Sequence, residues 1–321
     1  MKLKEIFDLA IQVGIDHDPR GREKVEHILV RRREDYGGLT GRKKEEYDLE
    51  RLTNPYSDSS LDFGDPKTEV KTVLAGIDID PGEVVLAKEY ERVSGKKIDL
   101  IIGHHPIGKA YTRLHEVMDI QIDVLARAGI PENISEGLLR ERVTQVARNV
   151  APINHYQPID AARLLNIPIL NFHTPADNSA WHFLEEVIER KKPERVGEVV
   201  EAIKEIPEFK EAVKLNAGPM IFVGSEDARA GKVIVSGFTG GTSGSDEIYE
   251  RMSHYGIGTE VAMHIRERAR EFAMKHFVNV VIAGHMASDS LGFNIIMDEL
   301  EKRGVEIVPC SGFIRHSRVK K

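Results

Sequence analysis

The chain has only one cysteine, Cys310, among its 321 residues. One cysteine cannot form a disulfide within the chain, which excludes a disulfide-stapled secreted scaffold and fits a reducing compartment. The chain also lacks an apolar run long enough to span a bilayer. Charged residues interrupt the apolar pattern of residues 1–13, which predict an amphipathic helix rather than a signal peptide. We expect a cytoplasmic protein that does not bind membranes.

An excess of positive charge is absent too. The formal net charge is -7 and the pI is about 6.0, which argues against a whole-protein electrostatic attraction to nucleic acid. Two short basic clusters, residues 31–33 and 42–44, are interleaved with acidic residues, which indicates a solvated helical face. We expect a small-molecule substrate rather than a nucleic acid partner.

Apolar runs alternate with helical patterns through most of the chain. Residues 70–78 and 98–103 are predicted strands, and the segments that follow them, 81–90 and 119–128, are predicted helices. This alternation predicts an α/β fold whose mainly parallel or mixed sheets are covered by helices. A single helix is predicted over residues 196–214.

The length is sufficient for two α/β domains, each with its own core. We predict one larger domain formed by residues 1–185 together with 265–321. Residues 190–260 are predicted to form a second, smaller α/β domain.

Two adjacent histidines, His104 and His105, follow the apolar run at 98–103. Gly103 allows a sharp turn, and Pro106 disfavours the α conformation at His105, so the pair is predicted at a strand end. Two adjacent imidazoles there can each reach a different metal ion. The alternative is that one histidine only caps the strand by hydrogen bonding.

The same pattern recurs at two other apolar runs. Residues 167–172 lead to His173 and Asp177, and residues 278–283 lead to His285 and Asp289. In open α/β sheets the carboxyl ends of the strands converge on the binding crevice, so these side chains can meet there. Such nitrogen and oxygen ligands suit zinc, manganese, iron, nickel or magnesium rather than copper(I) or an iron–sulfur cluster.

Each of these residues also has a purely structural interpretation. His285 and Asp289 are one helical turn apart and can form a surface pair. Asp177 can be an N-cap, because a helical pattern begins at Ser179. His173 can be an outer residue that orients a ligand. All these interpretations would have to hold together for the cluster to be an accident.

Three motifs resemble those of a known family. They are Gly-His-His-Pro at 103–106, His-Thr-x-x-Asp at 173–177 and Ala-Gly-His-x-x-x-Asp at 283–289. The pattern is similar to the NGG-one-interacting-factor-three-like family, also known as GTP cyclohydrolase I type 2-like. Upstream, residues 56–66 and 70–78 resemble the family's aromatic-Asp-Asn-x-Gly-Leu segment and first strand.

The resemblance implies a two-domain α/β protein with a dinuclear metal site, often assembled as a toroidal hexamer. The ligands of the two divalent ions, carried over by motif position, are His104, His105, Asp177, His285 and Asp289. The family has a bridging Glu where this chain has Asp289. The shorter side chain leaves open a narrower gap between the metals or a ligand to only one of them. Residues 17–54 and 133–165 look like additions to the family core.

Two neighbouring metal ions predict a hydrolase, because they activate a shared water and polarise an electrophile. The electrophile can be phosphorus in a phosphoester, carbon in an amide or a ring carbon in a nucleotide. His173 is the candidate catalytic residue, either as a general acid or as a residue that orients Asp177 or the water. The alternative is a non-catalytic metal-binding adaptor or metal-handling protein of ring-shaped assembly.

A glycine-rich loop at residues 237–246 follows a predicted strand and precedes a predicted helix. Its backbone amides can bind the anionic part of a substrate. The favoured alternative is a tight strand-to-helix turn with Ser245 as the N-cap.

Overall fold

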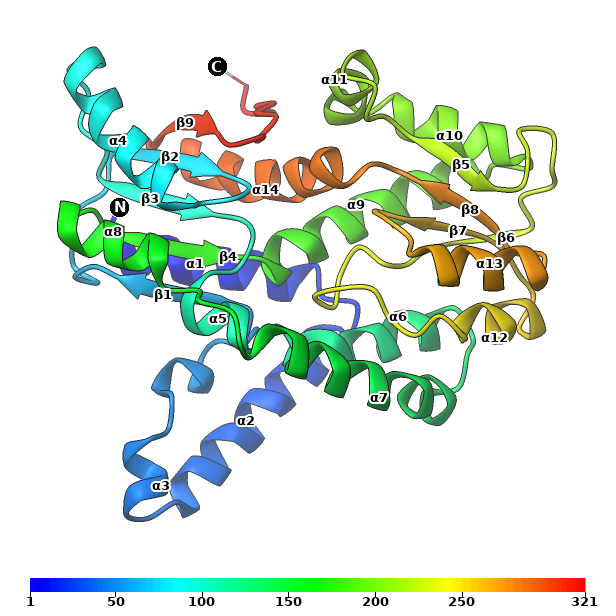
Figure 1. The fold of residues 1–321 in the computed structure, drawn as a ribbon, viewed down its shortest axis with the longest axis horizontal. Helices are drawn as coiled ribbons and strands as arrows, with labels where there is room; N and C mark the ends of the chain where they lie inside the picture. The colour runs from blue at the N-terminus through cyan, green and yellow to red at the C-terminus, as the bar shows by residue number, and fades with distance from the viewer. Residues whose placement is uncertain (321) are drawn as a thin grey trace.

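The computed structural model describes residues 1–320 and contains two mixed β-sheets (Figure 1). The five-stranded sheet has the order β1-β4-β3-β2-β9, and the four-stranded sheet has the order β5-β8-β7-β6. In each sheet one edge strand, β1 or β5, is antiparallel and the rest are parallel. The strands are β1 Ser59–Phe63, β2 Thr72–Gly76, β3 Leu100–Gly103, β4 Ile169–Phe172, β5 Met220–Val223, β6 Lys232–Val235, β7 Ile257–Ala262, β8 Asn279–Ile282 and β9 Glu306–Cys310. The predicted α/β class is confirmed.

Helices cover both faces of the five-stranded sheet. They are α1 Leu3–Asp16, α4 Pro81–Ser94, α8 Gln157–Leu165 and α14 His285–Glu301. α1 and α14 share one buried cluster with the sheet, and α4 and α8 share another on the opposite face. Every residue of β2 and β3 is buried, as expected for central parallel strands that are covered on both sides.

The four-stranded sheet is covered in the same way. Its helices are α6 Ile120–Arg127, α9 Thr174–Lys191, α10 Val196–Lys204, α11 Pro207–Lys214, α12 Ile248–His254 and α13 Glu267–Lys275. α9, α10 and α11 share a buried cluster with one face, and α6, α12 and α13 share a cluster with the other. Each sheet therefore has a core of its own.

Helices α9 and α14 lie side by side and join the two halves of the molecule (Figure 1). α9 follows β4 of the five-stranded sheet and packs on the four-stranded sheet, whereas α14 follows β8 of the four-stranded sheet and packs on the five-stranded sheet. At Gly292 the helices approach so closely that a Cβ would lie 2.0 Å from the Ala176 carbonyl oxygen. This crossing requires glycine.

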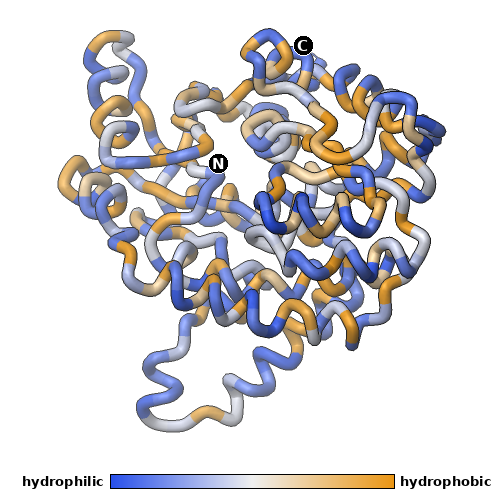
Figure 2. Tube along the Cα trace, turned by 45° about the vertical axis from the view of Figure 1, so that its right-hand side comes forward, coloured by the Kyte–Doolittle hydropathy of each residue, from blue (hydrophilic) through white to orange (hydrophobic). Residues whose placement is uncertain are grey.

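The two additions have different positions. Residues 17–54 contain α2 (Arg22–Gly38), α3 (Arg42–Glu45) and the 3-10 helix η1 (Leu49–Leu52), which form an arm that projects from the body (Figure 1). The arm is mostly hydrophilic (Figure 2), and α2 buries only Val25 and Leu29. The structure thus agrees with a solvated helical face for the basic clusters. Residues 133–165 instead form most of α7 (Glu132–Val150), and α8, against the body.

The single helix predicted over residues 196–214 is wrong. The segment forms α10 and α11, and Pro207 is the first residue of α11. Proline has no N–H to donate and clashes with the preceding helical turn, so it ends one helix and is well placed to begin the next.

The last part of the chain contributes to both sheets, because β8 belongs to the four-stranded sheet and β9 to the five-stranded sheet. The division into residues 1–185 with 265–321, and 190–260, stays a prediction. No helix within residues 1–320 combines the length and the apolar character needed to cross a membrane.

Candidate metal centre

The five predicted ligands come together where strands of both sheets end. His104 and His105 follow β3, Asp177 is in the first turn of α9 after β4, and His285 and Asp289 are in the first turns of α14 after β8. β3 and β4 are neighbours in one sheet, and β8 belongs to the other. The cluster therefore lies between the two sheets.

Two groups of potential ligand atoms share Asp289. His104, Asp177 and Asp289 form one group, and His105, His285 and Asp289 form the other, with the chosen atoms of each group within 4.8 Å of one another. A third group joins His173 to His104 and His105. All six residues singled out in the sequence are thus in one place.

The two carboxylate oxygens of Asp289 face different histidines. Oδ1 is 3.6 Å from His104 Nε2, which is also 3.5 Å from Asp177 Oδ1. Oδ2 is 3.4 Å from His105 Nε2 and 3.5 Å from His285 Nε2. These separations exceed those of hydrogen bonds. They match two ligand atoms that are each about 2.1 Å from one tetrahedral ion, since such atoms are about 3.4 Å apart.

Buried polar atoms in the cluster lack hydrogen-bond partners among residues 1–320. They are both ring nitrogens of His104, Oδ1 of Asp177 and both carboxylate oxygens of Asp289. An unpartnered buried carboxylate is costly unless a cation or a donor compensates it. A divalent ion supplies that compensation, so the residues present fit a metal.

Two aspartates hold histidines from outside the cluster. His105 Nδ1 donates to Asp78 Oδ1 (2.7 Å), and His173 Nδ1 donates to Asp58 Oδ2 (2.8 Å). Asp58 is fully buried and also accepts from the Thr174 hydroxyl at 2.7 Å. Because each aspartate engages Nδ1, Nε2 of the histidine is directed to the cluster, which is the usual arrangement around protein metals.

The structure excludes two of the alternative interpretations. α9 begins at Thr174 with His173 at the N-cap position, so Asp177 as an N-cap is wrong. Asp289 is 1% exposed, so it cannot form a surface pair with His285. Pro175 in the first turn explains the earlier helix start, since proline favours that position.

Burial and neighbouring charges shift the pKa values in the cluster. Burial lowers the pKa of His104 to about 4 and raises that of Asp177 to about 8. Burial opposes the charged form of His105 as well, but Asp289 and Asp78 raise its pKa to about 10. Burial also opposes the charge of Asp289, yet the histidines around it, His104 first, keep its pKa well below its ordinary value. Without metal, the His105 imidazolium is therefore the positive charge nearest to Asp289.

The cluster opens into a cleft of about 380 Å³. Residues 153–155, 157 and 158 of the second addition form part of its wall, as do Gly241 and Thr242 of the glycine-rich loop. Residues 17–54 contribute nothing to the wall.

The cap predicted for the helix after the glycine-rich loop is a different residue in the structure. Ser245 as an N-cap is wrong, because α12 begins at Ile248 with Glu247 at the cap position.

A solved structure, that of a NIF3 superfamily protein from Sphaerobacter thermophilus, is similar to this chain with 29% sequence identity and a TM-score of 0.71. The match covers 80% of this chain and 91% of that one. The chain belongs to the NIF3 superfamily. This membership confirms the family resemblance of the three His/Asp motifs.

Two further solved structures match this NIF3 superfamily chain at lower identity. Reduced HcgD from Methanocaldococcus jannaschii is 16% identical with a TM-score of 0.48, and the match covers 78% of this chain and 87% of that one. A Bacillus cereus protein related to NIF3 is 13% identical with a TM-score of 0.41, and the match covers 82% and 93%. No family model and no curated protein matches the chain.

Proposed function

We propose that the protein is a hydrolase that uses two divalent metal ions. His104, Asp177 and Asp289 Oδ1 would hold one ion, and His105, His285 and Asp289 Oδ2 the other. The observation that carries the proposal is Asp289, whose two buried oxygens lack hydrogen-bond partners among residues 1–320 and face two separate groups of ligand atoms. Zinc, manganese, iron, nickel and magnesium all accept such ligands.

Two divalent ions held by these residues would supply a water activated near neutral pH and would polarise the group under attack. Hydrolysis adds the oxygen of that water to the electrophilic atom, breaks the bond to the leaving group and gives the leaving group a proton. His173 is suited to deliver the proton, because Asp58 fixes its Nδ1 and leaves Nε2 directed to the cluster, 3.6 Å from Asp177 Oδ2.

Metal content per chain, measured by plasma mass spectrometry on protein without a histidine tag, tests the proposal. We expect about two ions in the parent protein and a marked loss in His105→Ala and Asp289→Ala, together with loss of hydrolytic activity. Circular dichroism should show that the fold persists. Glu34→Gln, an exposed change on the arm, is the matched control and should retain both ions.

Each outcome has a clear meaning. If metal is absent even after supplementation, or if both variants keep metal and activity, the proposal fails. If metal is bound and broad screening finds no metal-dependent turnover, the adaptor function replaces the hydrolase.

We also propose that the protein forms a homo-oligomer, with a hexamer as the expected size. The support is the family membership, since the resemblance to this family implies a toroidal hexamer.

A further inference from the structure

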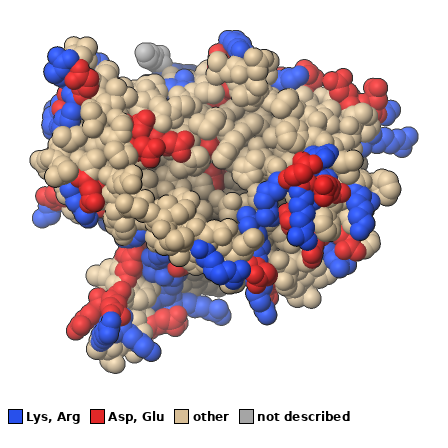
Figure 3. All heavy atoms as spheres, in the orientation of Figure 1, with Lys and Arg blue, Asp and Glu red and all other residues tan. Residues whose placement is uncertain are grey.

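The metal cleft has an unusual charge composition for a site that would receive phosphates. Its lining, within residues 1–320, contains no lysine and no arginine. It contains two carboxylates besides the proposed ligands, Asp78 and Asp80. Figure 3 shows a hollow near the centre of this face with acidic atoms in and beside it.

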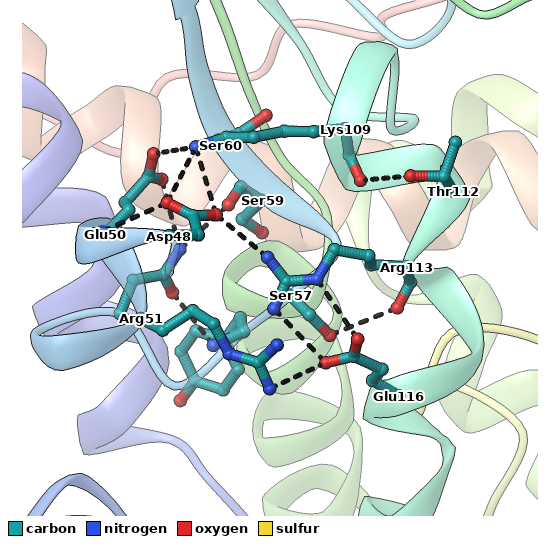
Figure 4. Close-up of polar contacts among 12 residues, drawn as sticks. Asp48, Glu50, Arg51, Ser57, Ser59, Ser60, Lys109, Thr112, Arg113 and Glu116 are labelled. Atoms are coloured by element: carbon teal, nitrogen blue, oxygen red, sulfur yellow. Dashed lines mark hydrogen bonds and ion pairs between the residues drawn. The ribbon is translucent and has the colours of Figure 1, made fainter. Parts of the chain in front are cut away.

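The cations of α5 (Gly108–Thr112) and the residue after it point away from the cleft. Tyr111 lines the cleft, whereas Lys109 and Arg113 line a separate small pocket at the base of the arm. Lys109 Nζ is 2.8 Å from Glu50 Oε2, and Arg113 is 2.9 Å from Asp48 Oδ2. Figure 4 shows both side chains directed to these acidic partners, so neither is available to a substrate.

Two arginines that contact the glycine-rich loop, outside the cleft lining, are also engaged. Arg142 Nε donates to the Ser243 carbonyl oxygen at 3.0 Å. Arg266 donates to the Gly244 carbonyl oxygen at 2.6 Å and is 2.7 Å from Asp246 Oδ1. Both arginines therefore brace the glycine-rich loop from behind, and the loop presents uncharged Gly241 and Thr242 to the cleft.

A count of formal charges gives the net charge of the metal-loaded cleft. Two divalent ions bring four positive charges, Asp177 and Asp289 remove two, and Asp78 and Asp80 remove the other two. A cleft of zero net charge gives a phosphate-rich substrate no long-range attraction. Phosphoryl sites in proteins add Arg or Lys to the metal for this reason.

Two aromatic rings, those of Tyr111 and His155, line one part of the cleft. The rings of Tyr111 and His155 are stacked, with 4.1 Å between their centroids. His155 Nε2 lies 2.9 Å from the Val150 carbonyl oxygen, and this hydrogen bond fixes the ring. An aromatic ring at the lining can pack against the planar, weakly polar group of an amide.

We propose that the metal cleft takes a cationic amide, with its positive group at Asp80, in preference to a phosphoester or a nucleotide. This inference rests on the proposed function and chooses among its substrates. In the reaction the oxygen of water bonds to the carbonyl carbon, the carbon–nitrogen bond breaks and the nitrogen takes a proton. The products are a carboxylic acid and an amine.

Binding of three hydroxamates that share one metal-binding group tests the charge preference without turnover. The cation is trimethylammonioacetohydroxamate, the neutral isostere is 3,3-dimethylbutyrohydroxamate and the anion is succinic monohydroxamate. Titration of the cobalt-loaded protein, followed by the cobalt absorption bands, should give the affinity order cation, neutral, anion. We expect about a fivefold advantage of the cation over its isostere, the size of one exposed ion pair.

Asp80→Asn should abolish the advantage of the cation. Asp80 is the N-cap of α4 and shares a capping box with Glu83, and asparagine caps helices as well as aspartate does, so this variant keeps its fold. Glu34→Gln removes the same charge from the distant arm and should keep the advantage.

The inference is wrong if the parent binds the anion most tightly, or binds cation and isostere equally. Loss of the proposed function has a different signature, because a cobalt-loaded protein that hydrolyses no amide or ester can still rank the three probes. A protein that takes up no cobalt fails both tests.

Discussion

Asp78 is a single exposed carboxylate on which the position of His105 depends. It accepts a hydrogen bond from His105 Nδ1 at 2.7 Å and directs Nε2 to Asp289. Removal of such an outer partner commonly weakens metal binding 10–100-fold. We therefore expect Asp78→Asn to weaken the metal affinity by about that factor, as measured by competition with a chromogenic chelator. An affinity equal to that of Glu34→Gln would show that His105 needs no orienting partner.

The protonation of two ligands gives a pH prediction at the same scale. In the metal-free protein the pKa of His105 is raised to about 10 and that of Asp177 to about 8, so both carry a proton at pH 7. Metal ligands must be deprotonated. Metal uptake at pH 7 should therefore release about two protons per chain, and the affinity should rise as the pH rises from 7 toward 9.

Calorimetry in buffers of different ionisation enthalpy counts the released protons directly. Uptake without proton release, or an affinity that falls over this pH range, would contradict the shifted pKa values of His105 and Asp177.

Some residues of the candidate metal centre could be predicted from the sequence, and others could not. His104, Asp177 and Asp289 could be predicted because each follows an apolar run that forms a strand, near the carboxyl end of that strand. Asp78 follows such a run as well, and the same signal could have found it. Asp58 could not be found in this way, because it precedes an antiparallel strand and reaches His173 only through the pairing of β1 with β4.

The contact between α9 and α14 is the critical one among the helices. A Cβ at Gly292 would lie 2.0 Å from the Ala176 carbonyl oxygen. Because this oxygen belongs to the backbone of α9, relieving the clash would require the helix to shift. Overpacking of this kind typically costs about 1–3 kcal/mol. We expect Gly292→Ala to lower the free energy of unfolding, measured by urea denaturation, by about 3 kcal/mol or more.

The same substitution should disturb the metal centre, since α9 carries Asp177 and α14 carries Asp289. Gly82→Ala is the control, because nothing lies within 4 Å of a Cβ there and the position is helical. It should leave stability and metal content unchanged or slightly improve stability. Equal stability of the two variants would show that the helices can separate without cost.

The boundaries of helices and strands could be predicted where a local residue such as proline sets them, and could not be predicted where tertiary packing sets them. Pro81 marked the start of α4, which was predicted, and Pro207 marked a break that the apolar pattern of residues 196–214 obscured. The partner sheet of β8 could not be predicted, since its apolar residues fit either sheet equally well. Tertiary pairing settles such cases.

The size of the assembly is a prediction for the whole molecule. A hexamer has a mass of about 216 kDa, six times the 36.0 kDa of one chain. Light scattering coupled to size exclusion measures this mass. A mass of one chain at micromolar concentration would contradict the predicted oligomer.

The position of the candidate centre between the sheets has a consequence for the order of events during folding. His104 and His285 are 181 residues apart along the chain (285 − 104) and follow strands of different sheets. Closing so long a loop is slow and unfavourable until both sheets exist. An ion would then arrive last, at a pocket that is already built. Such an ion can leave and be replaced in the native protein, so the metal found after purification would reflect cellular supply at that moment rather than the conditions under which the chain was made.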